Sequence, residues 1–289
     1  MIFSKMHGLG NDFVVVNGFK EHLSDTVLPK LAKRICDRNF GVGGDGLILV
    51  IPSETADFFM RMMNPDGSEA EMCGNGIRCA AKFAYEQGIT TADPVRVETL
   101  GGLKVIDLVK SNEKVTAARV NMGNPRLDRT EIPSFMPGTG PIINEPLALG
   151  DRTIFVTCVN MGNPHCVSFV EDVEKYPVRI IGQEVEVHPS FPERTNVEFI
   201  QVISPKEIRM RVWERGAGET LACGTGACAS VVASILNGKT ERSVVVHLNG
   251  GDLEIQWPED GPVMMTGPAV EVFTGEISLE TIADWTSVE

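Results

Sequence analysis

The sequence has no long apolar run and no excess of positive charge. Its longest aliphatic stretch, Leu47 to Ile51, is far shorter than the roughly 20 residues that a membrane-spanning helix requires. Residues 1–18 contain no basic segment followed by an apolar one, so no secretory signal is predicted. The net charge of −13 disfavours nucleic acid and anionic membrane as partners. We therefore expect a cytoplasmic protein that binds neither nucleic acid nor membrane.

The cysteines lack the spacing of a zinc site. Five residues separate Cys73 from Cys79 and four separate Cys223 from Cys228, whereas structural zinc sites usually have two to four residues between paired ligands, and no pair forms C-x-x-C. Seven cysteines, an odd number, with no secretory signal favour reduced thiols over a disulfide framework. We predict no metal, and a thiol redox or metal-binding module stays a weaker alternative. Three cysteines in apolar surroundings are predicted to be buried packing residues: Cys36, Cys158 and Cys166.

The chain contains an internal duplication. Met72-Cys-Gly-Asn-Gly76 returns 150 positions later as Ala222-Cys-Gly-Thr-Gly226, and the same offset places Glu69 on Glu219. An offset this long indicates a duplicated domain, not a short structural repeat. The length of 289 residues suits about two domains, and the charged fraction of 22% is ordinary for globular proteins. We place the domain boundary near Met122, before a connection rich in proline.

Each half is predicted to be rich in short strands and to contain one central helix. The helix after Cys73 carries Arg78, Lys82 and Glu86 as one polar stripe and should end near Gly88. Its counterpart, residues 225–237, has no charged residue, so we expect sheet to enclose it on nearly all sides. Another helix should begin near Leu28 and end near Gly41. Strands are predicted at 13–16, 47–51, 58–63, 95–100, 103–109, 115–121, 154–160, 197–202, 208–214, 244–248 and 253–257.

These patterns predict an α+β fold of two pseudo-symmetric, duplicated domains. Each domain should be a mostly antiparallel, barrel-like sheet wrapped around a central helix, with the active site in the cleft between the domains. The N-terminal half, residues 1–122, carries Cys73, and the C-terminal half, residues 123–274, carries Cys223.

The two matching cysteines predict acid–base chemistry at one carbon. Thiols presented from two halves can remove a proton from one face of a stereocentre and return one to the other face. A cysteine at a helix N-terminus meets unpaired N–H groups and the positive end of the helix dipole, which lower the pKa of its thiol. Gly74 and Gly224 should let a substrate carboxylate approach the backbone amides. Ordinary glycine turns with inert cysteines are the alternative interpretation of each stretch taken alone.

The two halves carry different residues at two matching positions, as an asymmetric substrate would require. The offset of 150 places Asn64 on Glu214 and Pro65 on Arg215. Arg215 can bind a carboxylate through two hydrogen bonds, and Glu214 can accept from an ammonium group. A solvated ion pair is the alternative for these two residues.

Two other motifs need a structural context. Gly41 to Gly46 contains G-x-G-x-x-G, but it follows a predicted helix and precedes a strand, so we reject a nucleotide site. The sequence Val-Asn-Met-Gly-Asn-Pro occurs at 120–125 and at 159–164, and His165 follows the second copy. Both copies suit turns. His165 taken alone would be structural, whereas beside a thiol it can tune the protonation of that thiol.

Taken together, these motifs resemble those of the diaminopimelate epimerases, which are pyridoxal-independent amino-acid epimerases. The resemblance runs through nearly the whole chain. It rests on His7-Gly-Leu-Gly-Asn-Asp-Phe13, Asn64-Pro-Asp-Gly-Ser68, Cys73-Gly-Asn-Gly76, Met161-Gly-Asn-Pro-His165, Pro192-Glu-Arg-Thr-Asn196, Glu214-Arg-Gly-Ala-Gly-Glu219 and Cys223-Gly-Thr-Gly226.

The resemblance implies conversion of LL-2,6-diaminopimelate to the meso form, in lysine and peptidoglycan biosynthesis, without a cofactor. Cys223 would remove the α-proton in that direction and Cys73 would donate from the other face, with His165 and Glu214 assisting. Many relatives have a glutamine contact where this chain has Gly46. The substrate-binding residues implied are Asn11, Asn64, Gly74, Asn75, Asn163, Asn196, Glu214, Arg215, Gly224 and Thr225.

The resemblance also implies two features of assembly. Residues from about 275 to 289 should return to the first domain, and Phe273 falls where some relatives have a tyrosine at a dimer interface, so we expect a homodimer. The nearest alternative activity is that of a proline racemase or hydroxyproline epimerase, which also uses paired thiols. Glu214 and Arg215 favour a longer substrate with a second charged end, and an assay with proline would separate the two. A pure binding protein would exchange no substrate proton.

Overall fold

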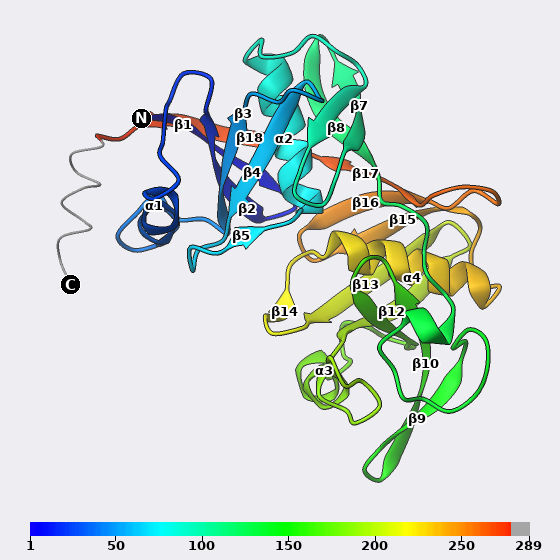
Figure 1. The fold of residues 1–289 in the computed structure, drawn as a ribbon. Helices are drawn as coiled ribbons and strands as arrows, with labels where there is room; N and C mark the ends of the chain where they lie inside the picture. The colour runs from blue at the N-terminus through cyan, green and yellow to red at the C-terminus, as the bar shows by residue number, and fades with distance from the viewer. Residues whose placement is uncertain (279–289) are drawn as a thin grey trace. The chain divides into compact units, whose positions relative to one another are not determined.

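Each half of the chain folds around one helix whose small and apolar residues suit a buried position. The computed structural model describes residues 1–278 (Figure 1). Unit 1 comprises Met1–Val120 and the described residues from Gly267 onward, and unit 2 comprises Asn121–Thr266. The first boundary lies beside the predicted Met122, whereas the chain re-enters unit 1 at Gly267, earlier than position 275. The part of the predicted return at residues 279–289 lies outside the described residues.

Unit 1 is built on a mixed sheet with the order β18-β1-β2-β3-β4-β6-β7-β8, and β5 pairs with β4. The pairs β2–β3 and β4–β6 are parallel and the other pairs are antiparallel. The strands are β1 (Ile2–Gly8), β2 (Asn11–Asn17), β3 (Gly46–Ile51), β4 (Phe58–Met63), β5 (Glu69–Ala70), β6 (Val95–Glu98), β7 (Lys104–Ser111), β8 (Lys114–Asn121) and β18 (Val270–Glu276).

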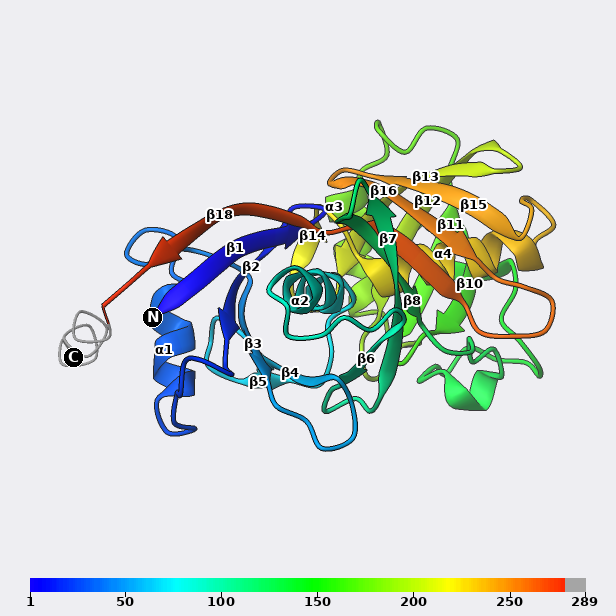
Figure 2. The same cartoon turned by 90° about the horizontal axis from the view of Figure 1, so that it is seen from above.

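The helix α2 (Gly74–Glu86) lies inside the curve of this sheet, and Figure 2 shows it end-on among the strands. Every residue from Asn75 to Ala84 is buried. The predicted polar stripe on this helix does not face water, because Arg78 and Lys82 are buried. Lys82 Nζ donates to the backbone oxygen of Val115 at 2.6 Å and to Glu86 at 2.7 Å. Val115 on β8 and Glu86 in the same helix have thus replaced solvent around the Lys82 cation.

Unit 2 repeats this strand pattern. Its sheet has the order β9-β10-β11-β12-β13-β15-β16-β17, β14 pairs with β13, and the parallel pairs are β11–β12 and β13–β15. The parallel pairs therefore stand at equivalent places in the two units. The strands are β9 (Glu145–Leu149), β10 (Arg152–Asn160), β11 (Pro164–Phe169), β12 (Asn196–Ser204), β13 (Glu207–Glu214), β14 (Gly218–Thr220), β15 (Ser243–Leu248), β16 (Gly251–Gln256) and β17 (Met264–Pro268).

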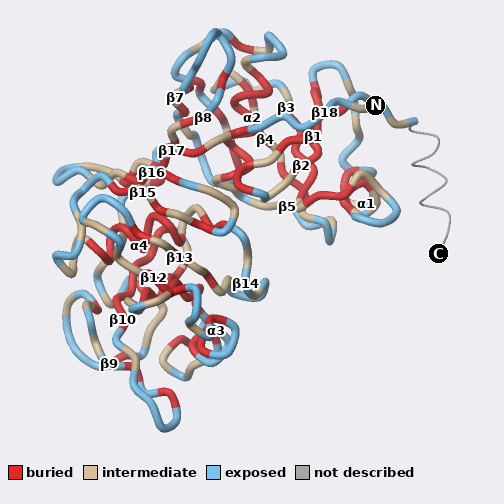
Figure 3. The backbone as a smooth tube through the Cα atoms, turned by 180° about the vertical axis from the view of Figure 1, so that it is seen from behind, coloured by how far each residue is buried: buried red, intermediate tan, exposed pale blue. Residues whose placement is uncertain are grey.

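The helix α4 (Gly224–Leu236) is the counterpart of α2, and it contacts β10, β11, β12, β13, β15 and β16. Residues Gly226 to Ser234 are all buried (Figure 3), as expected for a helix without a charged residue. The predicted α+β class, with two duplicated halves that each wrap a mostly antiparallel sheet around one helix, is confirmed. No helix within residues 1–278 is long and apolar enough to cross a membrane.

Three local features differ from the sequence prediction. The helix α1 (Leu28–Ile35) ends well before Gly41, because Asp37 accepts from the backbone N–H groups of Asn39 and Phe40, both at 2.8 Å, and forms a turn instead. The amphipathic helix α3 (Val178–Glu186) was not predicted, although it buries apolar residues at helical spacing. Several strands were also missed, among them β1 and β11, which lie beside the central helices.

Candidate active site

Cys73 is the residue that caps the N-terminus of α2. Its backbone is extended, and its Sγ accepts from the backbone N–H of Gly76 at 3.4 Å. Sγ also lies 3.7 Å from Oδ1 of Asn11, to which the thiol can donate. The strand β2 brings Asn11 to this place, because β2 begins at Asn11 and runs along α2. The first thiol thus meets the N–H groups of a helix N-terminus, as predicted from its sequence position.

A network of hydrogen bonds holds the surroundings of Cys73 in place. Asn11 Oδ1 also accepts from Nδ2 of Asn75 at 3.2 Å, and Asn11 Nδ2 donates to Asp45 at 2.7 Å. The buried guanidinium of Arg78 donates to Oδ1 of Asn75 at 2.8 Å and to the backbone oxygen of Gly74 at 3.0 Å. The network fixes which atoms of Asn11 and Asn75 face the thiol, because each amide group has its donor and acceptor sides engaged.

Cys223 caps the N-terminus of α4 in the same extended conformation, and its Sγ lies 3.6 Å from Oγ1 of Thr225. Its electrostatic setting differs from the prediction. Burial raises the pKa of the Cys223 thiol well above its ordinary range, and the nearby carboxylates of Glu214 and Glu198 raise that pKa further. The helix N-terminus opposes these effects but does not overcome them. The expectation of a lowered thiol pKa is therefore wrong for Cys223, because the sequence revealed neither the burial of this thiol, which is the largest cause of the shift, nor the nearby Glu198.

Two buried side chains, His165 and Glu198, form a pair close to Cys223. His165 Nδ1 lies 2.7 Å from Glu198 Oε1, and His165 Nε2 lies 2.9 Å from Oδ1 of Asn163. Neither the His165 nor the Glu198 side chain has any exposed surface. Burial also raises the pKa of Glu198, whereas His165 lowers it. His165 thus pairs with Glu198, a residue that the sequence analysis did not select and whose carboxyl group raises the pKa of the Cys223 thiol.

Hydrogen bonds from neighbouring side chains hold the turn that carries Glu214 and Arg215. Asn196 accepts from the backbone N–H of Arg215 at 3.0 Å and donates to the backbone oxygen of Pro164 at 2.9 Å. Thr220 donates to Glu214, and Glu186 accepts from the N–H of the next residue in the turn, Gly216, at 3.0 Å. Arg215 is exposed, and its Nη1 donates to the backbone oxygen of Glu193 at 3.1 Å. Its guanidinium therefore keeps free donors for a ligand.

The structure gathers most predicted residues into two groups, one in each unit. In unit 1, Asn11, Gly74 and Asn75 lie at Cys73, while Asn64 lies in the turn after β4 and donates to Ser68 at 3.0 Å. In unit 2, Thr225 lies at Cys223, Asn163 and His165 form one hydrogen-bonded group with Glu198, and Asn196 binds the turn that carries Glu214 and Arg215. Sequence reasoning missed Asp45, Glu186 and Glu198 as partners of these groups.

Gly46, at which the resemblance led us to expect a missing or replaced substrate contact, begins β3. A Cβ atom at this position would lie 3.0 Å from Cε of Met62 and 3.1 Å from the backbone oxygen of Met63. A longer side chain there would require these neighbours to move.

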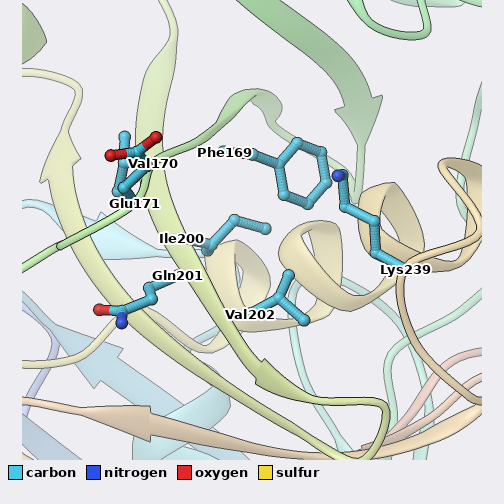
Figure 4. Close-up of a pocket in the computed structure, with 7 residues that line it drawn as sticks. All are labelled: Phe169, Val170, Glu171, Ile200, Gln201, Val202 and Lys239. Carbon is cyan, nitrogen blue, oxygen red and sulfur yellow. The ribbon is translucent and has the colours of Figure 1, made fainter.

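A surface pocket in unit 2 lies away from the cysteines. It reaches Lys239, just after the C-terminal end of α4, whereas Cys223 is at the N-terminal end of this helix. The Lys239 ammonium lies 4.8 Å from the centre of the Phe169 ring (Figure 4). The pocket has a volume of about 310 Å³ and is lined by Phe169, Val170, Glu171, Ile200, Gln201, Val202 and Lys239. We assign it no role in the chemistry of the thiols.

Comparison with solved structures identifies the fold. The chain superposes on a PhzF-family phenazine biosynthesis protein from Bacillus anthracis with a TM-score of 0.70 and 16% identity, covering 96% of this chain and 99% of that one. A hydroxyproline epimerase from Agrobacterium vitis with bound trans-4-hydroxy-L-proline gives a TM-score of 0.66 and 16% identity, covering 96% and 92%. At this level of identity, the likeness establishes a shared fold.

Comparison with sequences is more specific. The diaminopimelate epimerase of Pelotomaculum thermopropionicum is 57% identical over 281 residues, covering 97% of this chain and all 100% of that protein. The diaminopimelate epimerase of Moorella thermoacetica is 57% identical over 282 residues with the same coverage. The sequence profile of the diaminopimelate epimerase family matches residues 3–127 and 157–272, which include both cysteine motifs. The chain therefore belongs to the diaminopimelate epimerase family.

Proposed function

We propose that this chain epimerises LL-2,6-diaminopimelate to meso-diaminopimelate with two thiols and no cofactor, a step in lysine and peptidoglycan biosynthesis. One thiolate removes the α-proton: the C–H bond breaks and an S–H bond forms. The other thiol then donates its proton to the opposite face of the same carbon, which inverts the stereocentre. The roles reverse in the back reaction.

The observation that carries this proposal is the equivalence of the two cysteines. Each caps the central helix of a unit, and the two units have the same strand order with parallel pairs at matching places. Amide groups at the N-termini of α2 and α4, around Gly74, Asn75, Gly224 and Thr225, would bind the reacting carboxylate and stabilise the charge that develops on it.

The division of labour follows the family pattern. In the LL-to-meso direction Cys223 removes the α-proton and Cys73 donates one. Asn11, Asn64, Asn163 and Asn196 would bind the substrate with Glu214 and Arg215, and His165 and Glu214 would assist the thiol chemistry.

Replacing Arg215 with methionine should raise the KM for diaminopimelate by about 10- to 100-fold, because a charge-assisted contact with the distal carboxylate is lost. The kcat should fall less, since Arg215 contacts the end of the substrate that does not react. Steady-state kinetics with LL-diaminopimelate measures both constants. Arg209→Met is the control. Arg209 lies on β13, which ends just before Arg215, but it pairs with Glu174 at the surface. A KM change of equal size in both variants would exclude the assigned role of Arg215.

A comparison of substrates tests the proposed activity. The purified enzyme should epimerise LL-diaminopimelate without added pyridoxal phosphate and should leave L-proline and hydroxyproline unchanged. The fold alone is also compatible with proline-type substrates, so the same assay decides between the two classes. Turnover of proline but not of diaminopimelate would contradict the proposal.

We also propose that the enzyme is a cytoplasmic homodimer. An exposed apolar strip on the paired strands β1 and β18 supports the dimer, since Ile2, Val272 and Phe273 are about half exposed or more, at 61%, 56% and 48%. Light scattering should give twice the chain mass, and Phe273→Asp should shift the protein towards the monomer. A monomeric wild-type enzyme would contradict this part of the proposal.

A further inference from the structure

The surroundings of Cys73 in unit 1 and of Cys223 in unit 2 are the two half-sites of the duplicated fold. They differ in one pair of buried side chains on equivalent strands. In unit 1, β2 and β3 pair in parallel with Phe13 beside Gly46, and in unit 2, β11 and β12 pair with His165 beside Asn196. Two residues further along β3 and β12 come Ile48 and Glu198. The apolar pair Phe13 and Ile48 of unit 1 thus corresponds to the polar pair His165 and Glu198 of unit 2.

Contacts with the central helices confirm that Ile48 and Glu198 occupy equivalent places. A Cβ atom added at Gly76 would lie 3.0 Å from Cδ1 of Ile48 and 3.6 Å from the Sγ of Cys73. The equivalent Cβ at Gly226 would lie 2.6 Å from Oε1 of Glu198 and 3.3 Å from the Sγ of Cys223. In each unit, one buried side chain from a strand therefore packs against the first turn of the central helix, close to the cysteine. This side chain is the apolar Ile48 beside Cys73 and the carboxyl group of Glu198 beside Cys223.

The protonation of the pair can be worked out from its hydrogen bonds. With Oδ1 of Asn163 facing the ring, His165 Nε2 is the donor in this contact. The contact of 2.7 Å between His165 Nδ1 and Glu198 Oε1 needs a second proton, on one atom or the other. In the ionic form His165 is an imidazolium and Glu198 a carboxylate. The pair then places its negative end beside the thiol.

Within residues 1–278, the cationic partner that lowers the pKa of Glu198 is His165. The ionisable groups that face it are His165 and Cys166 on β11, Glu214 on β13 and Cys223 on α4. Oε2 of Glu198 is buried and has no hydrogen-bond partner among the described residues. A thiolate at Cys223 would therefore place negative charge close to the buried Glu198 and the half-buried Glu214, which is unfavourable.

We propose that Glu198 is a positioning residue of the Cys223 half-site. Its carboxyl group, held by His165, keeps Cys223 in the thiol form in the free enzyme, so that Cys73, which faces Ile48 at the equivalent place, ionises first. The upward shift of the Cys223 pKa agrees with this, since burial is its largest cause and Glu214 and Glu198 are the next.

A kinetic consequence follows, and it rests on the proposed function. The free enzyme is in the protonation state that starts the meso-to-LL reaction, with Cys73 as the base. The LL-to-meso reaction needs the proton to leave Cys223 first. The two directions should therefore have different pH profiles.

Alkylation of the two thiols at a series of pH values tests the proposal without any diaminopimelate. The substrate-free enzyme is treated with iodoacetamide, and mass spectrometry of its peptides gives separate rates for Cys73 and Cys223. The midpoint of each pH profile reports ionisation, whereas the plateau reports access. In the wild type the midpoint of Cys223 should lie at higher pH than that of Cys73. In Glu198→Gln, which removes the neighbouring negative charge, Cys223 should react about tenfold faster at neutral pH.

Two controls separate charge from packing. Glu198→Asp retains the charge and should keep Cys223 slow, and the Cys73 profile should stay the same in every variant. The wild-type comparison decides the question even if a variant fails to fold, since equal midpoints for the two cysteines would overturn the proposal. An unchanged Cys223 midpoint in folded Glu198→Gln would overturn it too. Neither result depends on which amino acid the enzyme epimerises.

Discussion

Replacing Cys73 or Cys223 with alanine is expected to lower the kcat/KM for epimerisation by about 10²- to 10⁴-fold. Each variant keeps its helix N-terminus but loses the group that moves a proton on one side of the substrate. Because both proton transfers are needed for inversion, the two variants should be impaired in both directions. Chromatographic separation of the LL and meso isomers measures the rate.

The other cysteines of the same helices serve as matched controls. Cys79 in α2 and Cys228 in α4 are buried within the helix bodies, and burial raises the pKa of Cys79 to about 12. Cys79→Ala and Cys228→Ala should keep the wild-type rate to within a few-fold. If Cys73→Ala or Cys223→Ala retained activity close to that of these controls, the two-thiol mechanism would be wrong.

Replacing Arg78 with methionine is expected to lower the free energy of unfolding by about 2–4 kcal/mol. Its guanidinium donates to the backbone oxygens of Gly74 and Pro268, at 3.0 and 3.2 Å, and to Oδ1 of Asn75 at 2.8 Å. Methionine fills similar space but leaves these acceptors without their donor. Urea denaturation followed by circular dichroism measures the change.

An exposed arginine of the same unit provides the control for Arg78. Arg96 on β6 donates to the backbone oxygen of Thr55 at 3.1 Å and faces solvent. Arg96→Met should change the free energy of unfolding by no more than about 0.5 kcal/mol. Equal losses in the two variants would show that the buried contacts of Arg78 contribute little. A loss of activity in Arg78→Met that exceeds its loss of folded protein would indicate that Asn75 and Asn11 have moved.

The duplication was readable from sequence because its markers are local. A cysteine followed by glycine at a helix start, and a helix body without charge at 225–237, depend on neighbouring residues only. Such patterns predicted the central helices, most of the strands and the fold class. The predicted end of α1 near Gly41 was wrong, because the side chain of Asp37 accepts hydrogen bonds from backbone N–H groups and stabilises a turn where the helix was expected to continue.

Residues whose role depends on parallel strand pairing were harder to predict. Glu198 is the one acidic residue in the otherwise apolar stretch Val197 to Ile200, and sequence alone does not say that β11 brings His165 beside it. Likewise, Arg78 was assigned to a polar stripe because its acceptor at Pro268 is distant in sequence. A charged residue inside an otherwise apolar strand or helix was the available signal in both cases. Its meaning depended on long-range contacts.

Incorporation of deuterium at the α-carbon is the decisive test of the two-thiol mechanism. The reduced enzyme is incubated with LL-diaminopimelate in heavy water without pyridoxal phosphate, and both isomers are analysed by mass spectrometry. We expect meso product with one solvent deuterium at the inverted carbon, because the incoming proton comes from a thiol that has exchanged with solvent. Meso product without deuterium, or no exchange by folded enzyme with reduced thiols, would contradict this mechanism.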